Sequence, residues 1–190
     1  NPILNITILY GGTSTEHKIS IQTGLAIAEA INGRYNLDMI NLDSEIYHSP
    51  HLLLDTDLVF NALHGGDGEN GNIQSFMDLH QIQYTGSGAK ACKIAMDKNI
   101  TKLIAKSVGI PTPNWVLLKR NVNNGMQLQD NNSLKFSYPY IVKPADEGST
   151  FGLTIVREES ELEDAISLAA EFGDEILIEE FIPGKEITVG

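Results

Sequence analysis

Short runs of aliphatic and β-branched residues alternate with helical patterns through the first half of the chain, and this alternation constrains the fold more than any other feature of the sequence. The expected strands are residues 3–10, 37–42, 58–63 and 82–85. The expected helices are residues 20–31, 73–80 and 89–96. Strands that alternate with helices form open sheets in which the strands run parallel. Residues 1–96 are therefore predicted to form an open parallel α/β domain.

A second domain is expected to begin at residue 97. A helix over residues 98–108 is predicted to end at Gly109, because glycine suits the left-handed position after a helix and Pro111 and Pro113 prevent its continuation. Further β-favouring runs predict strands over residues 140–143, 153–156, 176–181 and 186–189. The fold class is thus α/β, with residues 97–190 forming an α+β domain around a mainly antiparallel sheet.

Three segments of the second domain carry weaker signals. Ser160 and Glu163 have the spacing of a capping box, which predicts a helix that begins there and ends at Gly173. Residues 120–137 are rich in Asn, Gln and Gly and are interpreted as an exposed loop or hairpin of unreadable function. The last predicted strand has no turn or cap after it, which indicates a truncated or incompletely covered protein.

Charge and composition argue against several classes of protein. The formal net charge is −12 and no block of basic residues offsets it, which makes nucleic acid an unsuitable partner. The first ten residues lack the basic start of a signal peptide and are too interrupted by polar residues for a membrane span, so a cytoplasmic protein without a membrane partner is expected. The single Cys92 cannot form an internal disulfide, and its alanine-rich surroundings predict a buried helix face.

Two glycine-rich loops directly follow predicted strands of the first domain. Residues 10–17 read Tyr-Gly-Gly-Thr-Ser-Thr-Glu-His, and residues 64–71 read His-Gly-Gly-Asp-Gly-Glu-Asn-Gly. Ligands of open α/β sheets bind beyond the carboxyl ends of the strands, where small residues leave room for a substrate and Glu16 could receive an ammonium group. The first loop alone is at least as consistent with an exposed turn, and the second with a connection that needs glycine for its turns.

Two further motifs lie in the second domain. Residues 143–152 place a lysine before a flexible loop whose backbone amides could cover nucleotide phosphates, with Lys98 adding positive charge. Residues 179–186, Glu-Glu-Phe-Ile-Pro-Gly-Lys-Glu, offer carboxylates for an exocyclic amine and for ribose hydroxyls. An ordinary hairpin with a surface lysine and an acidic edge strand are the alternatives. The chain has no Walker P-loop sequence.

In this order and at these separations, the four motifs resemble those of the D-alanine–D-alanine ligases over nearly the whole chain. The lysine loop and the acidic stretch are typical of ATP-grasp enzymes in general. Gly-Gly-x-Ser-x-Glu followed by His-Gly-x-x-Gly-Glu-x-Gly indicates the D-alanine ligase branch. Two positions depart from the family pattern, because Asn70 replaces an aspartate and Thr150 replaces the second serine of a Gly-Ser-Ser loop. Both replacements keep hydrogen-bonding capacity.

The resemblance implies a substrate-binding N-terminal domain, the central nucleotide-binding domain of an ATP-grasp fold, and a two-step ligation. The carboxylate of one D-alanine would attack the γ-phosphate of ATP, and the amine of a second D-alanine would displace phosphate to give D-alanyl-D-alanine for peptidoglycan. It also implies that Glu16 and Ser149 are catalytic residues, that Glu16 binds the first ammonium group in a hydrogen-bonded set with Ser149, and that His64 lines the substrate pocket.

For the nucleotide, the resemblance implies that Lys98 and Lys143 contact the ATP phosphates and that residues 148–152 close over them. The loop residues assigned to this role are Gly148, Ser149 and Thr150. Glu179 would face the adenine amine and Glu186 would hold the ribose. The residues assigned near the base are Glu180, Phe181 and Ile182.

The cofactors implied are ATP and Mg²⁺, with Mn²⁺ as an alternative. The residues that bind the metal ion are expected beyond Gly190, so the 190-residue chain alone is expected to be inactive. The resemblance further implies a homodimer. Other ATP-grasp ligases, including those of the D-alanine–D-lactate and D-alanine–D-serine types, and a nucleotide-binding module without catalysis remain open alternatives. The residues that select the second substrate are expected largely beyond the printed sequence.

Overall fold

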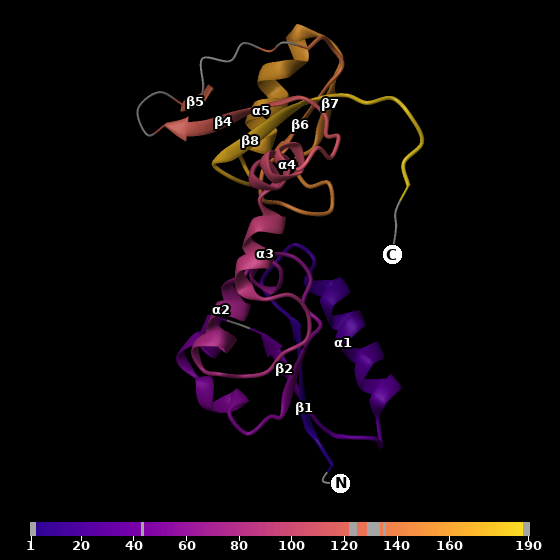
Figure 1. Cartoon of the computed structure of the whole chain (residues 1–190), viewed down its shortest axis with the longest axis vertical. Coiled ribbons are helices and arrows are strands. Elements are labelled where there is room, and N and C mark those ends of the chain that lie inside the picture. The colour runs from indigo at the N-terminus through magenta and orange to yellow at the C-terminus, as the bar shows by residue number, and fades with distance from the viewer. Residues whose placement is uncertain (1–2, 43, 122–124, 129–133, 135, 188–190) are drawn as a thin grey trace. The chain divides into compact units, whose positions relative to one another are not determined.

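The computed structural model describes residues 3–42, 44–121, 125–128, 134 and 136–187. The chain divides into two compact units, Asn1–Met96 and Asp97–Gly190 (Figure 1). Each unit has its own sheet and its own cluster of buried apolar side chains. Among the described residues, no helix is long and apolar enough to cross a membrane.

A parallel three-stranded sheet forms the centre of the first unit, which confirms the predicted α/β arrangement. Its strands are β1 (Asn5–Gly11), β2 (Asn36–Leu42) and β3 (Leu58–Asn61), in the order β2-β1-β3. The strand predicted over residues 82–85 is reduced to a single parallel bridge between Tyr84 and Val59. Because β1 and β3 run parallel, the loops that follow them leave the sheet at the same edge.

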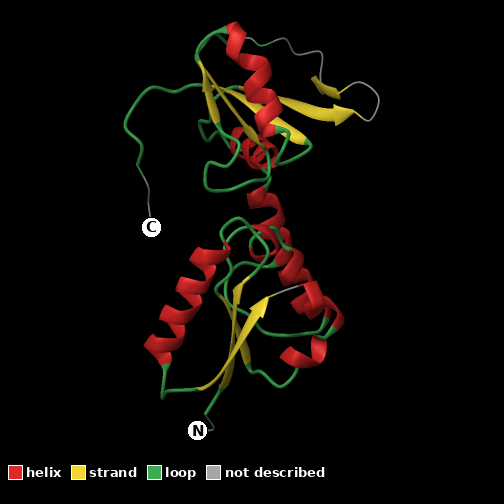
Figure 2. Ribbon diagram, turned by 180° about the vertical axis from the view of Figure 1, so that it is seen from behind, coloured by secondary structure: helices red, strands yellow, loops and turns green. Residues whose placement is uncertain are grey.

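Helices lie on both faces of this sheet (Figure 2). They are α1 (His17–Ile31), α2 (Asn72–Leu79) and α3 (Ala89–Met96), with the short 3-10 segments η1 (Ser44–His48), η2 (Pro50–Leu53) and η3 (Gly66–Gly68). Side chains alternate along β1. Leu9 therefore faces α2, where it shares a core with Ile73 and Met77. Tyr10 faces the other side and lies against Gly24 of α1.

The buried helix face predicted around Cys92 is wrong. No residue of α3 is fully buried, and the half-buried Cys92 thiol donates a hydrogen bond to the carbonyl of Ser87 at 3.3 Å. The neighbours Ala91 and Ala95 are exposed. Alanine favours helix formation whether or not it is buried, so an alanine-rich segment predicts the helix better than it predicts the core.

The second unit is built on a five-stranded antiparallel sheet. Its strands are β4 (Trp115–Asn121), β5 (Gly125–Leu128), β6 (Tyr140–Pro144), β7 (Thr154–Val156) and β8 (Glu175–Glu180), in the order β5-β4-β8-β6-β7. β4 is not among the strands predicted from the sequence. A loop or hairpin is predicted over residues 120–137, and in the described part of that segment β5 pairs with β4 as a hairpin. Of the strand predicted over residues 186–189, the first two residues are not in a strand and the last two lie outside the described residues.

The helix α4 (Lys98–Ser107) begins and ends as its sequence predicts. Asp97 caps the start, because its Oδ1 accepts a hydrogen bond from the backbone N–H of Ile100 at 2.9 Å. Gly109 has a φ of 77°, and the N–H of Ile110 donates to the carbonyl of Ala105 at 2.8 Å. This left-handed glycine ends the helix at the predicted position.

The predicted capping box of the next helix is wrong. The 3-10 segment η4 (Glu159–Glu161) precedes α5 (Leu162–Ala169), whose start has no side-chain cap. The Ser160 hydroxyl donates to the carboxylate of Glu158 instead, at 2.7 Å. α5 also ends four residues before Gly173.

The two faces of the five-stranded sheet carry different groups. On one face, Ile176 and Ile178 of β8 pack against Ala165 and Ala169 of α5. Side chains alternate along a strand, so Glu179 lies on the opposite face. Lys143 of β6 shares that face, because it lies opposite Leu177 in the register of β6 with β8. The face away from α5 therefore holds a charged pair.

Candidate functional site

In the first unit, the loops after β1 and β3 are bonded to each other. The Ser14 hydroxyl donates to the carbonyl of His64 at 2.6 Å, although the two residues are 50 positions apart. One turn into α1, the buried Ser20 hydroxyl donates to the carbonyl of Ala62 at 2.8 Å. The two glycine-rich motifs of the sequence thus form one structure at the carboxyl edge of the parallel sheet.

Gly65 allows these loops to approach closely. Its φ is 65°, and a Cβ built there would lie 2.7 Å from Oε2 of Glu16 and 3.2 Å from Oγ of Ser14. The Glu16 carboxylate therefore lies directly against the backbone that carries His64. The structure brings together the two residues predicted to bind substrate, beside a small pocket between the loops that Gly12, Ser14 and His64 help to line.

The His64 ring is held on both sides. Its Nε2 lies 2.9 Å from Oγ1 of Thr23, and its Nδ1 lies 3.9 Å from Oε1 of Glu69. Thr23 is on α1, so the helix that follows the first loop orients the histidine of the second. Thr23 is not among the residues predicted from the sequence, and its distance from the motifs leaves no sequence signal for it.

Asp67 organises the second loop and was likewise not predicted as a site residue. Its carboxylate accepts hydrogen bonds from the Tyr47 hydroxyl at 2.8 Å and from the side-chain amides of Asn72 at 2.7 Å and Asn70 at 3.3 Å. Burial acts to raise the pKa of Asp67, but these hydrogen bonds outweigh it and hold the pKa below its ordinary value. Asn70, which departs from the family pattern, thus supports the loop through its amide.

In the second unit, Glu179 lies between two lysines. Its Oε1 is 2.8 Å from Nζ of Lys102 on α4, and its Oε2 is 2.6 Å from Nζ of Lys143 on β6. The Glu179 side chain is only 7% exposed, so both ion pairs are shielded from water. Lys102 was not predicted, although its spacing of four residues from Lys98 places both lysines on one face of α4.

Lys98 lies near this group. Its ammonium donates to the backbone carbonyl of Glu147 and, at 3.5 Å, to that of Ala145. Burial and the positive charge of Lys143 lower the pKa of Lys98, and three carboxylates oppose that shift. These carboxylates belong to Asp146, Glu147 and Glu179. The predicted phosphate ligands Lys98 and Lys143 therefore share one environment.

The loop between β6 and β7 has an uncommon backbone. Ser149 and Thr150 have φ values of 49° and 63°, which few non-glycine residues adopt, and Gly152 follows at 67°. A Cβ at Gly152 would lie 2.8 Å from the Phe172 ring and 2.9 Å from Pro144, so only glycine fits there. Such strain is concentrated at ligand-binding loops, which makes Gly148, Ser149 and Thr150 suitable for a loop that covers phosphates.

The acidic stretch after Glu179 is spread over different surroundings. The Glu180 carboxylate accepts a hydrogen bond from the side-chain amide of Asn114 at 2.8 Å, and by alternation along β8 it points to the other side of the sheet from Glu179. Phe181 is half-buried, whereas Ile182 and Glu186 are exposed on the chain that follows β8.

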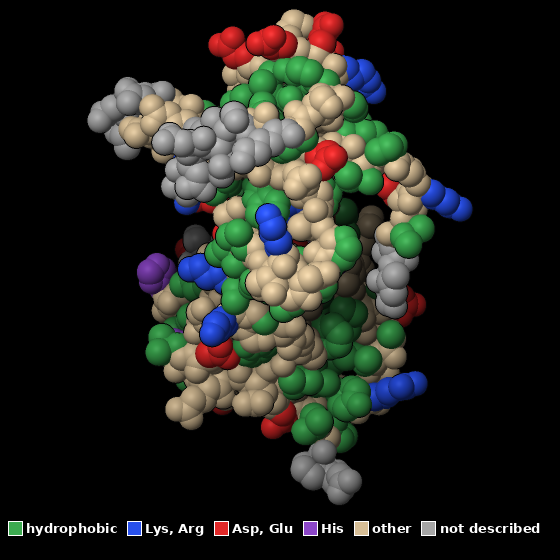
Figure 3. Space-filling view, turned by 45° about the horizontal axis from the view of Figure 1, so that its top comes forward, with side chains coloured by type: hydrophobic (Ala, Val, Ile, Leu, Met, Phe, Trp, Pro, Cys, Tyr) green, Lys and Arg blue, Asp and Glu red, His purple; other side chains and the backbone are tan. Residues whose placement is uncertain are grey.

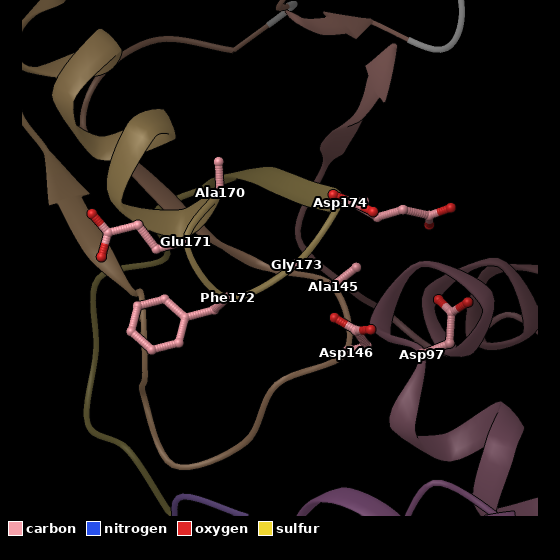
Figure 4. Close-up of a pocket in the computed structure, with 9 residues that line it drawn as sticks. Asp97, Ala145, Asp146, Ala170, Glu171, Phe172, Gly173 and Asp174 are labelled. Atoms are coloured by element: carbon pink, nitrogen blue, oxygen red, sulfur yellow. The ribbon is translucent and has the colours of Figure 1, made fainter. Parts of the chain in front are cut away.

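Two acidic regions of the second unit are unsuited to phosphate. Exposed carboxylates gather around the start of α5 (Figure 3), and they belong to Glu158, Glu159, Glu161, Glu163 and Asp164. A cavity of about 620 Å³ is lined by Asp97, Asp146 and Asp174, with further acidic residues and no lysine or arginine (Figure 4). Like charge disfavours a nucleotide at the first region, and at the cavity Arg120 and Lys119 already pair with Asp174 and Glu175. Within the described residues, no group of three or more His, Cys, Asp or Glu side chains is arranged to hold a metal ion.

Comparison with known protein families matches both units. The family described as D-ala D-ala ligase N-terminus matches residues 43–87, and the family described as D-ala D-ala ligase C-terminus matches residues 104–190. A D-alanine–D-alanine ligase of Coprothermobacter proteolyticus is 42% identical over 98% of the chain. The chain spans 61% of the length of that relative.

Solved structures give the same result. The D-alanine–D-alanine ligase of Bacillus anthracis complexed with ATP matches 95% of the chain with a TM-score of 0.79 and 29% identity, and 60% of that protein is covered. The VanG D-Ala:D-Ser ligase of Enterococcus faecalis matches 96% of the chain with a TM-score of 0.76 and 27% identity, and 64% of that protein is covered.

Proposed function

Because the chain belongs to the D-alanine–D-alanine ligase family, we propose that the protein joins two molecules of D-alanine to D-alanyl-D-alanine with ATP, for peptidoglycan synthesis. The observation that carries this proposal is the bonding of the two D-alanine-ligase motifs into one loop structure through Ser14 and His64, with the Glu16 carboxylate against it. An ATP-grasp ligase for an unrelated substrate would have no need of this pair of loops.

In the proposed first step, a carboxylate oxygen of D-alanine attacks the γ-phosphorus of ATP and ADP leaves, which produces an acylphosphate. Glu16 pairs with the ammonium group of this D-alanine, and His64, oriented by Thr23, lines its pocket. In the second step, the amine of another D-alanine attacks the acyl carbon, loses a proton and displaces phosphate. A carboxylate that receives an ammonium group fixes the orientation of the substrate, and such positioning is itself a contribution to catalysis.

For ATP, we assign the phosphates to Lys98 and Lys143, because phosphoryl transfer is accelerated by positioning and by neutralisation of charge. The loop from Gly148 to Gly152 covers the phosphates. Within it, Ser149 is assigned to the catalytic residues together with Glu16. Glu179 accepts from the adenine amine, with the residues after it around the base and the ribose. That second group consists of Glu180, Phe181, Ile182 and Glu186.

Mg²⁺, or Mn²⁺ in its place, would neutralise charge on the transferred phosphate. Among the described residues, no group of three or more His, Cys, Asp or Glu side chains is arranged to hold it. A homodimer and a cytoplasmic location are likewise part of the proposal.

Phosphate release by the intact protein tests the function. Release that requires both ATP and D-alanine, with D-alanyl-D-alanine as product, is expected, and L-alanine should not replace D-alanine. Glu16→Ala should raise the KM for D-alanine at least tenfold and leave the KM for ATP within about twofold. Glu29→Ala, an exposed change on α1, the helix that follows Glu16, serves as the control. Equal use of L-alanine, or no phosphate release with D-alanine, would refute the proposal.

The match to a D-Ala:D-Ser ligase supports a second candidate, in which D-serine is the second substrate. Incubation with equal D-alanine and D-serine, followed by mass spectrometry of the dipeptides, distinguishes the two activities. A product that is mainly D-alanyl-D-serine would favour this second candidate.

A further inference from the structure

We infer that Lys102 is a positioning residue of the nucleotide site, which keeps the buried Glu179 neutralised while Lys143 binds phosphate. The inference rests on the proposed function, since it concerns how that site binds ATP. It concerns a residue that neither the sequence motifs nor the assigned ATP contacts include.

Lys102 is enclosed by groups that fix its ammonium. Nζ lies 2.8 Å from Oε1 of Glu179, donates to Oγ1 of Thr112 at 2.8 Å, and lies 5.0 Å from the centre of the Trp115 ring. The ring is itself fixed, because its Nε1 donates to Oδ1 of Asn99 at 2.8 Å. The Lys102 side chain is 9% exposed, so its charge serves the interior of the unit rather than the solvent.

Lys143 makes the other ion pair of Glu179 and is more accessible. Its side chain is 21% exposed, against 9% for Lys102, and it precedes the loop assigned to the phosphates. A phosphate bound by Lys143 competes with Oε2 of Glu179 for the same ammonium. A buried carboxylate that loses its only cation is strongly destabilised. Lys143 can therefore turn to a phosphate only because Lys102 continues to neutralise Glu179.

The arrangement also leaves Glu179 able to bind adenine. A carboxylate has about four lone-pair sites, and the bond to Lys102 occupies one of them. Glu179 can thus accept the exocyclic amine while it stays paired with Lys102. Without Lys102, Glu179 and Lys143 would hold each other, and the triphosphate would lose a ligand.

Binding of inorganic tripolyphosphate and of ATP to the intact protein, measured by calorimetry, tests this role. Lys102→Met should weaken tripolyphosphate binding at least tenfold. Lys106→Met is the matched control, because Lys106 lies one turn further along α4, 5.8 Å from the centre of the same ring, and is exposed. The affinity of Lys106→Met for tripolyphosphate should stay within about twofold of that of the unchanged protein.

Removal of the competing carboxylate separates this role from a purely structural one. The double change Lys102→Met with Glu179→Gln should recover most of the lost tripolyphosphate affinity, since Lys143 then has no carboxylate to hold. Glu179→Gln alone should bind tripolyphosphate more tightly than the unchanged protein, and this variant keeps the inference testable even if Lys102→Met does not fold.

Three results would overturn the inference. They are unchanged tripolyphosphate binding in a folded Lys102→Met, a double variant no better than Lys102→Met, and weaker or equal tripolyphosphate binding in Glu179→Gln. Failure of the unchanged protein to bind ATP at all would instead refute the proposed function.

Discussion

Glu179→Gln should destabilise the second unit far more than its small chemical change suggests. The substitution removes a carboxylate that bonds two lysines in a shielded position, at 2.8 Å and 2.6 Å. Each pair is worth about 6 kcal/mol of Coulomb attraction at an effective dielectric of about 20, most of it offset by the cost of burial. Loss of one partner from a buried pair costs about 3–5 kcal/mol. Glutamine retains one acceptor for a lysine, so we expect a value near 3 kcal/mol.

The same strand provides a matched control. Glu175 of β8 pairs with Lys119, but the two side chains are 34% and 40% exposed. An exposed pair contributes about 0–1 kcal/mol, so Glu175→Gln should change stability by less than 1 kcal/mol. Both variants exchange for glutamine a β8 glutamate that is paired with lysine. Their difference therefore measures the effect of burial together with that of the second lysine at Glu179.

Urea unfolding followed by tryptophan fluorescence gives both values. Trp115 is the single tryptophan of the chain and lies in the second unit beside Lys102, so its emission reports this unit. With a slope of about 1–3 kcal/mol per molar urea, a loss of 3 kcal/mol lowers the midpoint by about 1–3 M. Equally small shifts for Glu179→Gln and Glu175→Gln would refute the reasoning, because the buried carboxylate would then contribute no more than an exposed one.

Two further predictions concern Lys98 and Gly65. The pKa of Lys98 is lowered from 10.5, so between its folded pKa and 10.5 the unfolded chain binds more protons and the stability contributed by this residue rises with pH. As the pH is raised into this range, the free energy of unfolding should therefore increase more in the unchanged protein than in Lys98→Met. Urea titrations of both proteins at several pH values measure this, and the same pH dependence in both would contradict the prediction. Gly65 has φ 65° and ψ 177°, a combination that essentially only glycine adopts, so Gly65→Ala should cost about 1–3 kcal/mol in backbone strain and also weaken D-alanine binding, since the new Cβ meets Glu16. Gly33→Ala has the same sign of φ with nothing within 4 Å, so it should lose stability in thermal unfolding without a change in the KM for D-alanine.

The fold was predictable where local chemistry and tertiary packing agree. The strand-helix alternation indicated the parallel sheet, and Gly109 indicated the end of α4. Predictions failed where a short polar signal had several possible partners. The Ser160 hydroxyl bonds the Glu158 carboxylate rather than the backbone of a helix start. β4 was missed because an antiparallel strand can depend on a partner far along the chain, here β8.

The candidate site shows the same division. Glu16 and His64 carried motif signals, and the structure places them together. Lys102 carried none, because a lysine on a helix is usually solvated and only the fold shows that a carboxylate and a ring enclose it. Thr23 was invisible for a similar reason, since its partner lies 41 positions away.

The loop structure of the first unit is anchored mainly through main-chain carbonyls. Ser14 bonds the carbonyl of His64, Ser20 bonds that of Ala62, and Gln74 bonds that of Gly68 at 2.7 Å. A carbonyl is the same whichever side chain its residue carries. The side chain at position 64 can therefore be exchanged without loss of the bond that holds its loop. Such a scaffold leaves evolution, or a protein engineer, able to alter the preference for the amino acid that occupies the pocket while the surrounding architecture persists.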